Sequence, residues 1–304
     1  RPVGIDRDSY EYATYIQTVK EINLIDKEPA FIFIKYLNDI LFQSNVQTFF
    51  LIFAILGVFT KFLAIQRLSK LPLLSVFAYI SYFFVLHEMT QIRAGVATGF
   101  FLLSIPDIYN KNLKSFIIKF LLAFSFHYSA IIMLPLYFLN SKKISKVFFL
   151  LPIIGLIGGY SNLINIFLNT NIINILPEIF VVKIQTYLML MELGEHTEKI
   201  NIFGIYYLIS LLILYFLLFL YTQNGLKFSY DIILIKILSI YFFIFYLFLP
   251  IPVFSLRLSE ILYTIMIILL PNFILYFKER IFMLFLISLL FMYIFFKSIH
   301  LLNF

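Results

Sequence analysis

Long hydrophobic runs, separated by short polar segments, occupy most of the chain. Each of the clearest runs is close to the roughly 20 residues that a helix needs to cross a bilayer. The runs predict membrane-spanning helices over residues 46–65, 71–87, 147–168, 202–222, 230–249, 258–277 and 281–299. The pattern therefore indicates an all-α fold, a polytopic bundle of transmembrane helices.

Shorter apolar segments lie between these runs. Residues 30–42 contain a lysine, an asparagine and an aspartate, which favours a helix lying at the membrane interface. We expect short or re-entrant legs near 94–106 and 116–139. The second of these is either one span or two legs that meet at His127. Residues 169–201 have balanced charge and form the longest internal connection, which we expect to be a loop.

Composition supports a membrane protein. Of the 304 residues, 62% are hydrophobic and 13% are charged, whereas soluble domains average roughly 45–50% and 25%. We expect a single integral membrane domain over residues 1–304, with residues 1–45 on the non-cytoplasmic side. The chain begins at Arg1 and shows no secretory leader, so we expect a removed leader or a missing N-terminal helix.

Cysteine usage and net charge narrow the chemistry further. The chain has no cysteine, which excludes a disulfide framework, a thiol nucleophile and a thiolate metal site. Its net charge of +7 is typical of basic cytoplasmic loops in a membrane protein and favours these over nucleic-acid binding. We expect no cofactor, and the sequence does not exclude a bound metal ion.

Basic residues orient the predicted spans. If Lys61, Arg67 and Lys70 lie in the cytoplasm, and 116–139 forms two legs, every other basic cluster falls on the same side. The connection 169–201 then lies outside. Polar residues without an anchoring role gather on or near the non-cytoplasmic side: Asp6, Asp8, His87, Glu88, Arg93, His127, Arg257 and Glu260.

The segment HEMTQIRAG places the side chains of His87, Glu88, Gln91 and Arg93 among hydrophobic neighbours. Ionisable groups within a membrane are costly and usually face a partner or a cavity. Arg93 is either a helix-end arginine that reaches the lipid headgroups or a guanidinium that holds a phosphate through paired donors. Gly95 and Gly99 predict close helix packing beside it. Glu88 is near enough in sequence to orient it.

Two further segments carry candidate residues. His127, in AFSFHYSA, is either a hydrogen-bonded structural group or a general base. Pro250 and Pro252 break the preceding helix, so we expect a new helix to open at Arg257. Arg257 and Glu260 are three residues apart, and they either pair locally or offer a second anion-binding arginine.

The N-terminal region has two polar features. Asp6 and Asp8, in GIDRDSY, either hold a divalent metal beside substrate phosphates or belong to a solvated loop. Glu28 and Pro29 predict a helix start, because proline fits the first helical position and an acid suits the positive end of the helix dipole.

Five stretches in order resemble the EpsG family, bacterial membrane proteins of exopolysaccharide and capsule clusters that are related in role to Wzy polymerases. The stretches are GIDRDSYEYATYI, EPAFIFIKYL, IRAGVATGFFLLSI, AFSFHYSAIIMLPLYFL and SLRLSEILYTIMIILLP. The resemblance covers residues 4–271, and IRAG-x-A and FHYSA are its most specific parts. Arg7 stands where the family often has threonine, which weakens a metal site at Asp6 and Asp8.

The resemblance implies an enzyme of the inner membrane. Such a glycosyltransferase joins oligosaccharide repeat units, carried on undecaprenyl pyrophosphate, at the outer face of the bacterial cytoplasmic membrane. A GT-C-like helical architecture and one more helix before Arg1 are also implied. We expect the lipid-linked oligosaccharide, the growing polysaccharide and the bilayer as partners, together with a chain-length regulator and a flippase of the same pathway.

Two other functions fit a chain of this class. A transporter of lipid-linked sugars or polysaccharide would usually show internal pseudo-symmetry, and we find no repeat. A membrane O-acyltransferase also uses an intramembrane histidine, but it takes its acyl donor from the cytoplasm.

With the implied polymerase activity, the candidate residues take two roles. The candidates for the catalytic acid or base are His127, Glu88 and Glu260. The candidates for binding pyrophosphate or sugar are Arg93, Arg257, Asp6, Tyr10, Gln91 and His87. Pyrophosphate is a good leaving group, so arginines could stabilise its growing charge without a metal.

Overall fold

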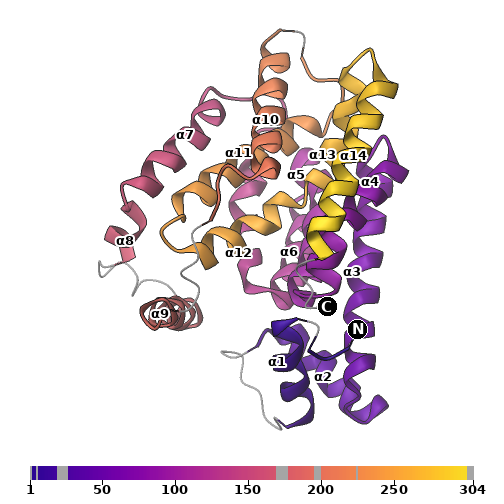
Figure 1. The fold of residues 1–304 in the computed structure, drawn as a ribbon, viewed down its shortest axis with the longest axis vertical. Helices are drawn as coiled ribbons and strands as arrows, with labels where there is room; N and C mark the ends of the chain where they lie inside the picture. The colour runs from indigo at the N-terminus through magenta and orange to yellow at the C-terminus, as the bar shows by residue number, and fades with distance from the viewer. Residues whose placement is uncertain are drawn as a thin grey trace. The chain divides into compact units, whose positions relative to one another are not determined.

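The computed structural model shows a helical chain that divides into two compact units (Figure 1). The structure describes residues 2–4, 6–18, 27–168, 177–194, 200–223 and 225–299. These residues form helices joined by turns, with no strand among them. Unit 1 comprises Arg1–Ser141 and Thr264–Phe304, and unit 2 comprises Lys142–Tyr263. The all-α prediction is therefore confirmed.

Unit 1 contains most of the candidate residues. Its helices are α1 (Arg7–Gln17), α2 (Pro29–Phe42), α3 (Val46–Leu68), α4 (Pro72–Ala78), the π-helix η1 (Tyr79–Glu88), α5 (Ile92–Asn110), α6 (Leu113–Phe126), the 3-10 helix η2 (Tyr128–Phe138), α13 (Met266–Phe273), the 3-10 helix η4 (Ile274–Tyr276) and α14 (Arg280–Ile299). Side-chain caps explain two of the helix starts. Asp6 accepts the Ser9 N–H at 3.0 Å, and Asn45 accepts the Thr48 N–H at 3.0 Å. Pro29 opens α2, as the sequence predicts.

Glycines allow α5 to pack closely in unit 1. A methyl group on Gly99 would lie 1.9 Å from Thr60 Oγ1 on α3, and one on Gly95 would lie 3.0 Å from a backbone carbonyl. Neither position has room for a larger side chain, so the predicted close packing is confirmed. The leg expected over 94–106 is longer than predicted, because α5 continues through an internal proline to Asn110.

Residues 116–139 form two helical legs, the alternative that places a break at His127. α6 ends at Phe126, His127 has an extended backbone (φ −154°, ψ 119°), and η2 begins at Tyr128. The legs pack against each other and against α5. The histidine therefore lies at the turn between the legs, as expected.

The C-terminal helices of unit 1 pack against α4 and η1. The Ser298 hydroxyl donates to the Ser81 carbonyl at 3.0 Å, which joins α14 to η1. The backbone N–H of Lys70 donates to Asn272 Oδ1 at 2.8 Å and ties the end of α3 to α13. The span expected over 71–87 is therefore α4 continued by the π-helix η1, and α14 packs against η1.

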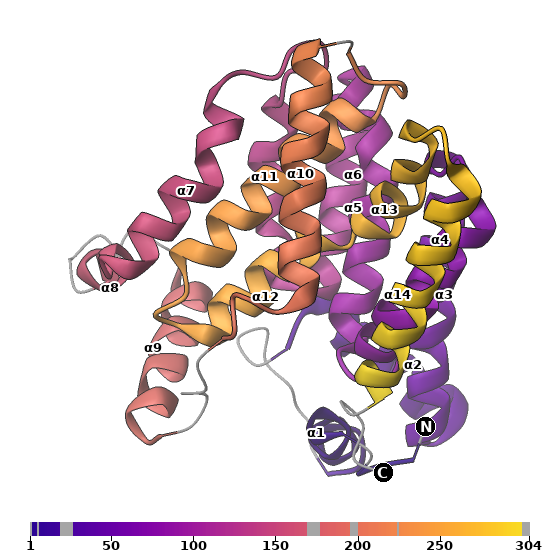
Figure 2. The same cartoon turned by 45° about the horizontal axis from the view of Figure 1, so that its top comes forward.

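Unit 2 is built around α11. Its helices are α7 (Val147–Tyr160), α8 (Leu163–Leu168), α9 (Glu178–Glu192), α10 (Ile205–Gln223), α11 (Asp231–Leu247) and α12 (Pro252–Tyr263). α11 packs against α7 and α12 (Figure 2). A methyl group on Gly155 would lie 2.4 Å from the Phe243 carbonyl oxygen, and one on Gly159 would lie 2.0 Å from that of Tyr246. Two α7 glycines thus bring the α7 and α11 backbones into contact.

Two expectations for unit 2 are wrong at their helix boundaries. The single span expected over 147–168 ends at Tyr160, and α8 begins after Asn162, whose φ of 53° lies in the left-handed region. Arg257 does not open a helix, because α12 begins five residues earlier at Pro252. Proline at a first helical position is tolerated, so the helix starts there.

The connection 169–201 is not a simple loop. After Pro177 it forms α9, whose sequence EIFVVKIQTYLMLME carries apolar residues at helical spacing. None of the α9 residues is fully buried. The prediction that this connection lies outside the membrane stays a prediction.

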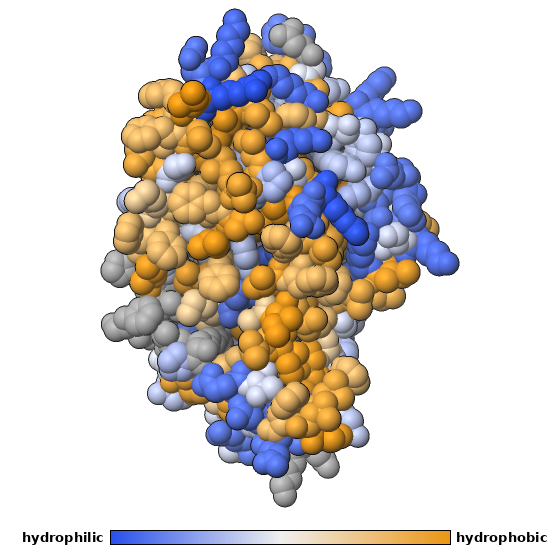
Figure 3. Space-filling model, turned by 90° about the vertical axis from the view of Figure 1, so that its right-hand side faces the viewer, coloured by the Kyte–Doolittle hydropathy of each residue, from blue (hydrophilic) through white to orange (hydrophobic). Residues whose placement is uncertain are grey.

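Three helices among the described residues, α3, α10 and α14, are long and apolar enough to span a membrane. A fourth span is added if α12 and α13 together form one interrupted crossing. Exposed hydrophobic side chains cover α3 and α14, for example Leu51, Phe59 and Ile281. Figure 3 views the molecule from the side where α3, α4 and α14 lie in Figure 1, and hydrophobic side chains cover much of that face. The polytopic membrane bundle is therefore confirmed.

Candidate functional site

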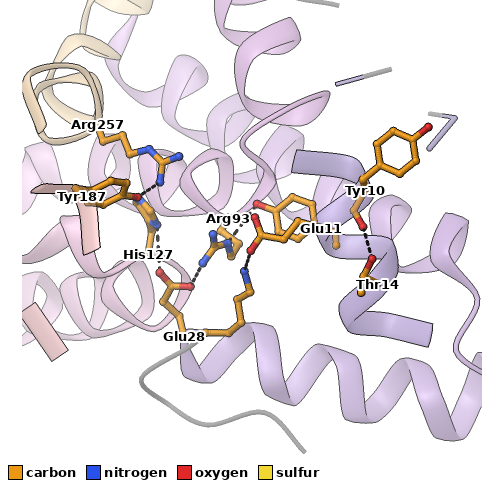
Figure 4. A network of polar contacts seen from close by, with 10 residues as sticks. Tyr10, Glu11, Thr14, Glu28, Arg93, His127, Tyr187 and Arg257 are labelled. Carbon is orange, nitrogen blue, oxygen red and sulfur yellow. Dashed lines mark hydrogen bonds and ion pairs between the residues drawn. The ribbon is translucent and has the colours of Figure 1, made fainter. Parts of the chain in front are cut away.

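Arg93 lies in the first turn of α5, where its positive charge opposes the helix dipole. Its Nη1 pairs with Glu28 Oε2, and its Nε donates to the Tyr12 hydroxyl at 3.3 Å (Figure 4). The Arg93 side chain is 14% exposed, whereas that of Glu28 is fully buried. The carboxylate therefore compensates a cation that the helix end itself disfavours.

His127 and Tyr128 approach the other oxygen of the same carboxylate. His127 Nδ1 lies 3.3 Å from Glu28 Oε1, and the backbone N–H of Tyr128 donates to Oε1 at 3.5 Å. The extended backbone at His127 ends α6, so the Tyr128 N–H belongs to a helix start and has no partner within its helix. A histidine and a backbone donor thus face Glu28 from the turn between the legs.

Glu28 is the residue that joins these groups, and the sequence predicted only a helix start there. It precedes Pro29, but its side chain makes no capping hydrogen bond to α2. It reaches instead toward Arg93 and His127 (Figure 4). These partners are far away in the sequence, since Arg93 comes 65 positions after Glu28. The one available signal was a charge at the edge of the apolar run EPAFIFIKYL.

An aromatic layer lies beside the Arg93 guanidinium. Tyr12 and Phe31 are buried, with ring centroids 5.8 Å apart. Arg93 Cζ is 5.6 Å from the Tyr12 centroid and 5.9 Å from that of Phe31. Burial raises the pKa of the Tyr12 hydroxyl, and Arg93 opposes this rise. The rings hold the arginine in place by cation–π attraction.

Glu88 belongs to a second ion pair and does not orient Arg93. Its Oε1 accepts from Lys61 Nζ at 2.7 Å and from the Tyr79 hydroxyl at 2.7 Å. Lys61 also donates to the Gly95 carbonyl at 2.6 Å, two residues after Arg93. The side chains of Lys61 and Glu88 are 0% and 1% exposed. Through these hydrogen bonds, the pair joins α3 and η1 to the first turn of α5.

The same contact corrects the expected topology. Lys61 was placed in a cytoplasmic cluster and Glu88 at the opposite side, yet the two side chains touch. The reason is that α3 continues to Leu68, so Lys61 lies two turns inside the helix. Arg67 and Lys70 are exposed at its end and still mark the predicted cytoplasmic side.

The remaining candidates of the HEMTQIRAG segment are His87, within η1, and Gln91, directly before α5. His87 is fully buried, and its ring centroid lies 5.5 Å from that of Phe83. Gln91 precedes α5, where its backbone N–H donates to the Leu86 carbonyl at 2.8 Å and its carbonyl accepts from Gly95 at 2.9 Å. Their assignment to substrate binding stays a prediction.

Asp6 and Tyr10 belong to α1. Asp6 is buried as the cap of this helix, and Tyr10 is 64% exposed. Among the described residues, no three His, Cys, Asp or Glu side chains are grouped to hold a metal ion. The arrangement around Asp6 is therefore explained by helix capping.

Arg257 and Glu260 lie on α12 in unit 2. Arg257 Nη1 donates to the Tyr187 hydroxyl of α9, and the Tyr187 ring packs edge-on against Phe254 at 5.4 Å. Among the contacts of the described residues, the local pair with Glu260, which was one of two alternatives, is not seen, because the arginine turns toward α9. Glu260 is half-buried on the same helix.

These features define a polytopic helical membrane protein in which a buried carboxylate joins a partly exposed guanidinium and imidazole in unit 1. The sequence model of the EpsG family matches residues 1–304, the whole chain, and the chain therefore belongs to the EpsG family. This bears out the resemblance and fits a role in polysaccharide polymerisation in general. No curated protein and no solved structure matches the chain.

Proposed function

We propose that this chain is a glycosyltransferase that joins oligosaccharide repeat units carried on undecaprenyl pyrophosphate, at the outer face of the bacterial cytoplasmic membrane. Family membership supports polymerisation in general. The observation that carries the proposal is the position of Glu28, which holds Arg93 by one carboxylate oxygen and faces His127 with the other.

His127 is the proposed general base. His127 Nδ1 lies 3.3 Å from Glu28 Oε1, so the mechanism places the ring proton of the neutral imidazole on Nδ1. The lone pair is then on Nε2, where it takes the proton of the acceptor hydroxyl. Glu28 fixes the tautomer and stabilises the imidazolium that forms, as a carboxylate does in other base-orienting pairs. The acceptor oxygen bonds to the anomeric carbon of the donor sugar, and the bond from that carbon to the pyrophosphate oxygen breaks.

Arg93 is the proposed group for the leaving pyrophosphate. As the carbon–oxygen bond breaks, negative charge grows on the phosphate, and a fixed guanidinium stabilises that charge without reorganising. The contacts with Glu28, Tyr12 and Phe31 hold the arginine in one orientation. Glu88 and Lys61, buried as a pair, position α5 and take no part in proton transfer.

The test is polymerisation in vitro, with the purified full chain in nanodiscs and a defined lipid-linked repeat unit. His127→Asn keeps a donor toward Glu28 but removes the proton-accepting Nε2. Its kcat should fall by about 100-fold or more, with little change in KM. Wild-type turnover in this variant would remove His127 from the mechanism.

The same preparation separates the rival functions. A wild-type protein that moves the lipid-linked sugar across the bilayer without lengthening it would be a transporter. Transfer of acyl groups without new glycosidic bonds would indicate an O-acyltransferase. Either result would replace the polymerase proposal.

A further inference from the structure

Lys27 is a buried cation directly before Glu28, and none of the proposed steps uses it. Its side chain is 4% exposed, and its Nζ pairs with Glu11 Oε1 on α1. The Nζ also lies 4.2 Å from the centroid of the Tyr15 ring. A lysine is almost never buried in this way without a charged partner.

Lys27 and Arg93 face the same two aromatic rings. Lys27 Nζ is 5.8 Å from the Tyr12 centroid and 5.8 Å from the Phe31 centroid. The corresponding distances of Arg93 Cζ are 5.6 and 5.9 Å. Burial lowers the pKa of Lys27, and repulsion by Arg93 lowers it further. Two cations that face the same two rings and repel each other favour an anion that neutralises both.

The carboxylates that now neutralise these cations are not equivalent. Glu28 is fully buried and is also held by His127 and Tyr128. Glu11 is 52% exposed on α1. An incoming anion can displace a solvated carboxylate from Lys27 far more easily than it can displace Glu28, whose release would leave a buried charge. Figure 4 shows Glu11 and Glu28 on the two sides of the Arg93 guanidinium.

We propose that Lys27 and Arg93 together form a diphosphate-binding site. Glu11 pairs with Lys27 in the empty site, and a bound diphosphate takes the place of the Glu11 carboxylate. This inference rests on the proposed function and assigns the second cation of the same site. One phosphate is held by Arg93 and the other by Lys27. Both cations face the rings of Tyr12 and Phe31, and a diphosphate has one phosphate group for each of them, so it is preferred over a single phosphate.

The test measures binding of inorganic pyrophosphate and of inorganic phosphate to the purified full chain by isothermal titration calorimetry. Wild-type protein should bind pyrophosphate at least about tenfold more tightly than phosphate. Lys27→Met should weaken pyrophosphate binding by at least about tenfold, the loss expected for a hydrogen bond to a charged group. Lys35→Met is the matched control, because Lys35 is also buried and paired with an acid, Asp39. It should bind like wild type.

The Glu11→Gln variant distinguishes a carboxylate that competes with the ligand from one that only forms a structural ion pair. Removing the competing carboxylate should tighten pyrophosphate binding, whereas loss of a structural pair would weaken it or leave it unchanged. Lys27→Arg keeps the charge and should bind within a few-fold of wild type. The Glu11→Gln and Lys27→Arg variants test the diphosphate-binding site even if Lys27→Met does not fold.

Three results would overturn the site: equal affinity for the two probes, wild-type binding in Lys27→Met, or binding in Glu11→Gln that is weaker than or equal to that of wild type. The polymerisation assay keeps this inference apart from the proposed function. If Lys27→Met polymerises with wild-type KM while His127→Asn does not turn over, the diphosphate site is wrong and the polymerase stands. If pyrophosphate binds as expected but no polymer forms, the polymerase fails and the site stands.

Discussion

At the scale of single residues, Glu28 connects groups that the sequence presents as separate. Arg93 and His127 could be selected from the sequence, because each is an ionisable side chain in an apolar run. Glu28, the partner of both, could not be selected in this way. An acidic residue before a proline is already explained as the start of a helix, so its sequence context gives no sign of a further role. The mistaken pairing of Glu88 with Arg93 has the same origin, since nearness in sequence says little about which side chains meet between helices.

Replacing Arg93 with lysine tests the paired donors of the guanidinium. Arg93→Lys keeps the charge but cannot contact Glu28, Tyr12 and a phosphate together, so polymerisation in vitro should fall by at least about tenfold. The protein should still insert into the membrane. Arg67→Lys, at an exposed arginine near the end of α3, is the control and should polymerise normally. Wild-type chain length in Arg93→Lys would exclude the phosphate-binding role.

The Lys61–Glu88 pair predicts strong non-additivity. Lys61→Met or Glu88→Leu alone leaves a buried charge without its partner and should destabilise the protein by about 3 kcal/mol or more. The double variant removes both charges and should recover much of that loss. Thermal unfolding in detergent measures all four proteins. Additive losses would mean that the contact contributes little.

At the scale of helices, close approach at small residues determines which helices touch. The GxxxG spacing in α5 correctly predicted close packing, but it did not identify α3 as the neighbour. The tight spacing of Gly99 against Thr60 supplies that information. Two local features were also missed. The sequence has no local signal for the π-helix η1. The glycines near the end of α7 did not indicate where that helix ends.

Gly99→Ala should destabilise unit 1, because its methyl group would overlap Thr60 Oγ1, which is itself bonded to the Leu56 carbonyl at 2.8 Å. We expect a loss of about 1–3 kcal/mol, seen as a lower unfolding temperature. Combining it with Thr60→Gly should cost less than the sum of the two single changes. If the losses simply add, Thr60 is not what excludes the methyl group.

At the scale of the whole molecule, the placement of the site along α3 agrees with the proposed outer location. Phe31, next to Arg93, packs on Phe49 and Phe53 in the first part of α3. The exposed Arg67 and Lys70 lie at the other end of that helix. Because basic residues favour the cytoplasmic side, the cluster around Glu28 is expected in the outer half of the membrane.

Cysteine labelling tests this orientation in a chain that has no native cysteine. An impermeant maleimide added to intact spheroplasts should label Tyr10→Cys, at an exposed position of α1, and not Lys114→Cys, at the exposed start of α6. Met189→Cys on α9 should be labelled like Tyr10→Cys. The reverse pattern would place the site on the cytoplasmic side and favour an acyltransferase. Labelling after lysis is the control for reactivity at each position.

By itself, the sequence determined that this is an all-α membrane protein, and it marked His127 as the point where two legs would meet if residues 116–139 were not one span. Both follow from local physics, since a bilayer demands long apolar segments whose backbone hydrogen bonds close within each helix. Only the tertiary structure decided that Glu28 pairs with Arg93, that Lys61 pairs with Glu88, and that Lys27 shares two rings with Arg93. A buried charge must find a partner, but helix packing between distant segments decides which partner is within reach.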